Sequence, residues 1–231
     1  REVRVRASLG DWTYDPMGKI QFLPPGTLKT SAASWTAFAP AEFLLQGKAT
    51  GTLTYTVTVP EDAAPGTHWG VLFLESEDPN PLPGVPLATM RVRMAHVFYV
   101  NVPPLVSSGR ITGIVPSAPK GPQDPFRFAL QYQNTGNAAQ KLSGRFEVRD
   151  ASGKKVAEVA VEEVVVLPGQ VRLLPIALVG PLPTGSYTAL AVLNYGGPTK
   201  DVAADLPFTL EAPLAAPPAP PPAEGEKEGT P

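Results

Sequence analysis

The sequence predicts an all-β protein that consists of two tandem β-sandwich domains and a C-terminal tail. Its apolar residues recur almost everywhere with a period of two, which is the spacing of half-buried strands. A block of sequence with a proline-marked corner occurs twice, and its copies lie about 119 residues apart, counted from His68 to Tyr187. That distance is roughly the length of one sandwich domain, and 231 residues are enough for two domains of about 100 residues.

Alternation of apolar and polar residues marks strands in both halves of the chain. It is clearest over residues 2–7, 51–59, 126–133 and 144–149. No stretch has the spacing of an amphipathic helix. Residues 155–166 come nearest, but they are rich in valine, and β-branched side chains favour strands. Strand structure is therefore expected throughout.

The repeated corner indicates the type of sandwich. Leu182, Gly185 and Tyr187 have the spacing of a tyrosine corner, in which the tyrosine at the start of a strand bonds to the backbone a few residues upstream. His68 holds the same position in the first copy, two residues after Gly66. We therefore expect two Ig-like/fibronectin III-like sandwiches, with His68 and Tyr187 as structural corner residues rather than catalytic ones.

These patterns divide the chain into four parts. The first domain is expected over residues 1–102, and the segment 103–110 is expected to link it to a second domain over 111–211. Residues 212–231 are rich in proline, alanine and glutamate, and such a segment is expected to be extended or disordered because it cannot bury a core.

The first domain starts late in comparison with the second. Residues 2–7 correspond to 144–149, because both lead into a turn with an aspartate and then into the repeated block. No counterpart of 126–133 precedes them, so we expect the first domain to lack its first strand or strands. Removal of upstream residues is the favoured explanation. A different strand order, or a strand donated by a partner, are the alternatives.

Composition argues against several classes of function. A net charge of −2 leaves no basic surface for nucleic acid, and the absence of cysteine rules out disulfides, thiol catalysis and cysteine zinc sites. The two histidines have no nucleophile motif beside them, and there is no glycine-rich phosphate loop. No apolar run approaches the roughly 18 residues of a membrane helix. We therefore expect no enzyme activity, no catalytic residues and no cofactor.

Two ligand sites are weaker candidates. An acidic segment offers oxygen ligands for Ca²⁺, but it lacks the spacing of a known loop, so a solvated loop without metal is favoured. Its carboxylates are Glu75, Glu77 and Asp78. Three tryptophans would suit a carbohydrate platform if they were exposed, whereas their positions at strand ends favour core or corner packing. They are Trp12, Trp35 and Trp69.

A series of short motifs runs through both halves. They are Asp11-Trp12, Ser34-Trp35, Pro40-x-x-Phe43-x-Leu45, Val57-x-Val59-Pro60, Pro65-Gly66-x-His68-x-Gly70, Arg91 to Tyr99, Asn134 to Asn137 and Leu167-Pro168-Gly169. The motifs of the first half resemble the first domain of periplasmic pilus chaperones (PapD-like) and of peptidoglycan-associated surface proteins of Gram-positive bacteria. Those of the second half fit generic Ig-like modules of the bacterial cell envelope.

The resemblance implies a role in protein binding at the periplasm or cell surface. In pilus chaperones the last strand of the first domain pairs with a pilin subunit. The corresponding residues form a candidate strand-pairing edge: Met90, Arg91, Val92, Arg93 and Met94. Ordinary core packing of the two methionines and the valine is the favoured alternative.

We therefore expect a non-catalytic cell-envelope protein that binds or assembles protein partners, with strand addition as the candidate mechanism. One alternative is a structural subunit of a surface filament or layer, in which the partner is a second copy. The other is an adhesin or a polysaccharide-binding module. Self-association in solution separates the first alternative from the main expectation, and a glycan array tests the second.

Overall fold

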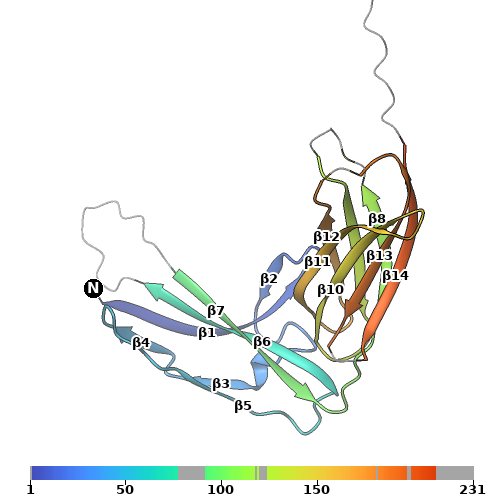
Figure 1. Ribbon diagram of the computed structural model, residues 1–231. Helices are drawn as coiled ribbons and strands as arrows, with labels where there is room; N and C mark the ends of the chain where they lie inside the picture. The colour runs from blue at the N-terminus through green and yellow to red at the C-terminus, as the bar shows by residue number, and fades with distance from the viewer. Residues whose placement is uncertain are drawn as a thin grey trace, which may run out of the picture.

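The computed structural model describes residues 2–77, 92–117, 119, 124–180, 182–196 and 199–211. Met90, Arg91, Asp78 and the tail 212–231 lie outside the described residues. Apart from one short 3-10 turn, η1 (Ala33–Trp35), all regular structure in the described part is β. The predicted all-β class is confirmed. Figure 1 shows an elongated first sheet that meets a second, compact sandwich at an angle.

The first unit has one long sheet and one small sheet. The long sheet has the order β2-β1-β6-β7, and β4 pairs with the first half of β1, while β3 and β5 form the separate small sheet. The strands are β1 (Val3–Tyr14), β2 (Ile20–Leu23), β3 (Thr36–Ala39), β4 (Glu42–Leu45), β5 (Thr54–Val57), β6 (Gly66–Glu77) and β7 (Val92–Val102).

The second unit is a sandwich of two antiparallel sheets, with the orders β11-β10-β13-β14 and β12-β9-β8. Its strands are β8 (Gly109–Ser117), β9 (Arg127–Asn134), β10 (Gln140–Asp150), β11 (Lys155–Val166), β12 (Val171–Ala177), β13 (Gly185–Asn194) and β14 (Asp201–Leu210). Alternate residues of facing strands fill the space between the sheets, including the fully buried Phe128, Leu130 and Phe146. This is the packing expected of period-two sequence patterns.

The two long sheets use equivalent strands in the same order. In the first unit β1 pairs with β6, and in the second unit β10 pairs with β13. β6 and β13 are the strands that follow the corner in their units. The strand expected over 155–166 is found as β11, and those expected over 2–7 and 144–149 lie within the longer β1 and β10.

The two corners have the same hydrogen bond. Tyr187 Oη donates to the carbonyl of Pro183 over 2.7 Å, and His68 Nε2 lies 2.8 Å from the carbonyl oxygen of Ala64. A carbonyl can only accept, so the histidine nitrogen is the donor. Gly66 and Gly185 begin the strands with φ of 138° and 155°, a region that other residues rarely adopt. The two copies of the sequence repeat therefore share the backbone geometry of the corner.

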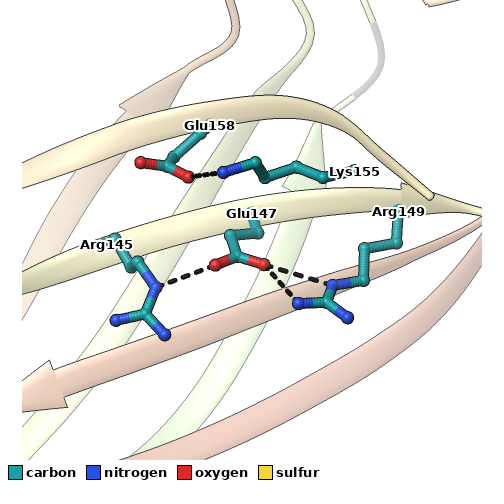
Figure 2. A network of polar contacts seen from close by, with 5 residues as sticks. All are labelled: Arg145, Glu147, Arg149, Lys155 and Glu158. Atoms are coloured by element: carbon teal, nitrogen blue, oxygen red, sulfur yellow. Dashed lines mark hydrogen bonds and ion pairs between the residues drawn. The ribbon is translucent and has the colours of Figure 1, made fainter. Parts of the chain in front are cut away.

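A charged network lies on the outer face of the second unit (Figure 2). Glu147 on β10 is almost fully buried and receives hydrogen bonds from the guanidinium groups of Arg145 (2.8 Å) and Arg149 (2.7 Å). Lys155 and Glu158 form a separate ion pair on β11. The bonds from Arg149 and Arg145 lower the pKa of Glu147, and its burial opposes them.

We expect Glu147→Gln to destabilise the protein in a pH-dependent way. A carboxyl group with a lowered pKa in the folded state stabilises it above the pKa of the unfolded chain, about 4.3, and loses this effect as the pH falls through the folded value. The urea midpoint, followed by far-UV circular dichroism, should differ from wild type most near pH 7 and least below about pH 4. Glu158→Gln is the matched control and should have a smaller effect, because its ion pair is exposed. A constant difference across this pH range would contradict the prediction.

Candidate functional site

The outer edge of the first long sheet is formed by β7. This strand pairs with β6 from the Gly66–Val102 pair to the Ser76–Val92 pair, and within the described residues it pairs with no other strand. Val92 and Met94 are 45% and 59% exposed. Neither side chain therefore packs in a core, in contrast to the favoured expectation from the sequence.

The small sheet covers β7 only in part. The ring of Tyr55 on β5 lies 5.4 Å from that of Phe98, and its hydroxyl lies 3.2 Å from His96 Nε2. Phe98 is buried, whereas His96 is exposed. Because side chains two residues apart share a face of a strand, Met94 and Val92 continue the same row beyond this cover. The result is an edge strand whose first half shows two uncovered apolar side chains.

On the opposite face of β7, side chains of β6 and β2 contact Arg93. Arg93 Nε forms an ion pair with Glu75 on β6 (2.8 Å), and its guanidinium stacks 3.6 Å from the centre of the Phe73 ring. Phe22 on β2 packs edge-on against the same ring. Arg93 therefore holds β7 to β6, while Val92 and Met94 point to the uncovered face.

The acidic segment considered for calcium is engaged with arginines. Glu75 pairs with Arg93, and Glu77 pairs with Arg6 over 3.2 Å. In the described ranges, no group of three or more histidine, aspartate or glutamate residues is placed to hold a metal ion.

The three tryptophans do not form an exposed platform. Trp12 and Trp69 are 6% and 3% exposed, and Trp69 Nε1 donates to the backbone oxygen of Trp12 over 2.7 Å. Trp35 is half-buried and stacks on His68, with 4.3 Å between ring centres. Their packing is that of core and corner residues, which was the favoured expectation.

We call the place where the two units meet the elbow. An apolar cluster joins the units there, and no local sequence pattern indicated it. Trp12, Tyr14 and Trp69 of the first unit pack there with Leu167 of the second. The Leu167 amide donates to Tyr14 Oη over 2.7 Å. Because the cluster excludes water from this bond, it fixes one unit against the other.

A second contact joins the first corner to the turn before β10. Thr67 donates its amide to the Asn137 carbonyl (2.8 Å), and its hydroxyl accepts from the Ala139 amide (2.9 Å). The Asn137 side chain donates to the Pro65 carbonyl (3.3 Å). The sequence marks both segments as turns, but it contains no signal that they touch.

Comparison with known proteins finds similarity among solved structures. A chain from a chaperone–tip adhesin complex of CFA/I fimbriae biogenesis is 10% identical, with a TM-score of 0.48, over 90% of this chain and 85% of that one. The class 5 fimbriae chaperone CfaA is 13% identical, with a TM-score of 0.45, over 93% and 88%. The CupB2 chaperone of Pseudomonas aeruginosa is 12% identical, with a TM-score of 0.40, over 91% and 87%. Each of these similarities extends over most of both chains.

No family model matches the chain, and no curated protein matches it significantly. Among the helices of the described part, none is long and apolar enough to cross a membrane.

Proposed function

We propose that this chain is a non-catalytic protein of the bacterial cell envelope that binds protein partners by strand addition at β7, in the manner of a periplasmic pilus chaperone. The observation that carries the proposal is the uncovered pair Val92 and Met94 on a strand that pairs on one side only within the described residues.

The chemistry of this edge suits an extended apolar segment. An unpaired strand edge offers a row of N–H and C=O groups to an incoming strand, and soluble proteins usually protect such edges with charged side chains. The residue between Val92 and Met94 is Arg93, and its guanidinium is already engaged by Glu75 and Phe73. Covering the exposed half of each apolar side chain contributes on the order of 1 kcal/mol, in addition to the strand hydrogen bonds.

The partner class that we propose is an exported protein domain that offers an extended, alternating apolar segment, such as a pilus subunit. This choice follows the resemblance of residues 91–99 to the last strand of the first chaperone domain. The same edge in a second copy of the chain would give a self-assembling subunit instead, so self-association is the second candidate.

Site-specific crosslinking tests the edge directly. The chain has no cysteine, so Met94→Cys creates a single attachment point for a thiol-reactive photocrosslinker. We expect it to form a product with an envelope protein of the source organism, joined through an alternating apolar segment. Val115→Cys on β8 is the matched control, because Val115 is similarly exposed at 58%, and it should form none.

Adding Val92→Lys to Met94→Cys should lower the yield at least about tenfold, because a charge then replaces the remaining apolar side chain of the pair. Circular dichroism checks that the fold is unchanged. Equal products from residues 94 and 115 would contradict the proposal, and products with a second copy alone would establish self-assembly in its place.

A further inference from the structure

The row of exposed side chains on β7 ends at a histidine. His96 follows Val92 and Met94 on the same face of the strand, and like them it is exposed. Phe98, the next member of the row, is buried and packs against the ring of Tyr55. His96 therefore lies at the boundary between the uncovered and the covered part of β7, and a strand added beside Met94 reaches it within two residues.

One hydrogen bond holds the imidazole ring in this position. Tyr55 Oη lies 3.2 Å from His96 Nε2, and the two ring centres are 5.6 Å apart. A hydroxyl group can donate to a neutral ring nitrogen and can accept from a protonated one, so the contact persists in both charge states. Protonation therefore changes the charge of the row and leaves His96 in its place.

A charge on His96 has no counter-ion in the described part of the chain. Tyr55 is the titratable group that faces the ring from β5, and the residues of β6 beside His96 on the same face are Leu72 and Leu74. No carboxylate among the described residues forms an ion pair with the ring. The guanidinium of Arg93 lies on the opposite face of the sheet. The charged form of the ring therefore depends on water for its solvation.

We propose that His96 makes strand addition at β7 dependent on pH, so that the edge binds its partner when the ring is neutral and releases it when the ring is protonated. An imidazole is the side chain whose charge ordinarily changes between about pH 5 and 8. An added strand places its apolar side chains beside Met94 and His96, because cross-strand neighbours share a face. Covering a charged ring without a counter-ion costs free energy, so the charged state disfavours the partner. This inference rests on the proposed function.

Peptide titrations of the intact chain at two pH values test the inference. The probe is acetyl-Ser-Val-Thr-Val-Asn-Val-Ser amide, which alternates apolar and polar residues and carries no charge. Backbone amide signals of residues 92–96 are followed by nuclear magnetic resonance at about pH 7.5 and about pH 5.5, at constant ionic strength. Signals around Val115 on β8 serve as the reference.

We expect the dissociation constant to be on the order of tenfold higher at the lower pH. Carboxylates ordinarily titrate near pH 4 and tyrosines near pH 10, so imidazoles are the side chains that change charge over this range. The second histidine of the chain, His68, is buried at the first corner, away from the exposed half of β7.

Two substitutions at the same exposed position separate the effect of charge from that of shape. His96→Gln keeps a polar side chain without a titrating group, and it should bind the peptide equally at both pH values. His96→Lys carries a positive charge at both, so its binding at the higher pH should be as weak as that of the wild type at the lower pH. Circular dichroism checks that the variants are folded, and if one is not, the other decides.

The outcomes distinguish this inference from the proposed function. Equal wild-type dissociation constants at both pH values, or a change with pH that persists in His96→Gln, would overturn the pH dependence and leave strand addition standing. Absence of binding at both pH values would contradict strand addition at β7, and this inference with it.

Discussion

Replacement of Trp69 by alanine is expected to lower the free energy of unfolding by about 3–5 kcal/mol, the usual cost of truncating a buried tryptophan. Trp69 is near the start of β6 and is 3% exposed. Its ring belongs to the elbow cluster, and Nε1 donates to the Trp12 carbonyl. The variant therefore loses apolar burial, leaves a cavity where the two units meet, and leaves that carbonyl without its donor.

Urea unfolding followed by far-UV circular dichroism measures this effect. Trp35→Ala is the matched control, because Trp35 is half-buried and stacks on His68 outside the elbow cluster. We expect the control to cost less than about half as much, in proportion to its smaller buried area. Equal losses in both variants would contradict a special role of the elbow cluster.

Local sequence patterns predicted most of the fold, because the alternation of apolar and polar residues in a strand reflects which of its faces is buried. Residues 155–166 are rich in β-branched valine, and they form β11. At the second corner, Leu182, Gly185 and Tyr187 have the spacing that lets the Tyr187 hydroxyl donate a hydrogen bond to the Pro183 carbonyl. Such features depend on neighbours a few residues away, so the sequence alone contains the needed information.

The elbow could not be predicted in this way. The Tyr14–Leu167 bond joins residues 153 positions apart, and the Pro16–Leu173 bond is similarly long-range. Neither segment departs from ordinary strand or turn composition. Contacts of this kind depend on how two folded units meet. Neither the apolar periodicity nor any motif within one unit contains information about that arrangement.

The β7 edge was predicted in part. Side chains two residues apart share a face of a strand, so Val92 and Met94 lie on the same face as Phe98, but this spacing does not indicate how far a second layer reaches along that face. Tyr55 covers Phe98, while Met94 remains exposed. The favoured expectation of core packing was therefore wrong for Val92 and Met94, because the small sheet that contains Tyr55 is short.

Phe146→Ala is expected to destabilise the second unit by about 3–5 kcal/mol. Phe146 is fully buried in the middle of β10, and its ring centre lies 4.8 Å from that of Phe128 on the facing sheet. Phe128 in turn contacts Phe126 and Phe208. Loss of the Phe146 ring therefore leaves a cavity at the centre of an aromatic cluster that connects both sheets.

The positions of the tryptophans make this experiment informative about both units. All three tryptophans lie in the first unit, so their fluorescence reports on that unit, whereas far-UV circular dichroism reports on both. We expect Phe146→Ala to lower the urea midpoint by circular dichroism. The fluorescence midpoint should fall with it, because Leu167 of the second unit completes the cluster around Trp12 and Trp69. Phe22→Ala, at a ring that is 45% exposed, is the control and should have a smaller effect. A fluorescence midpoint that stays at the wild-type value would show that the elbow does not couple the two units.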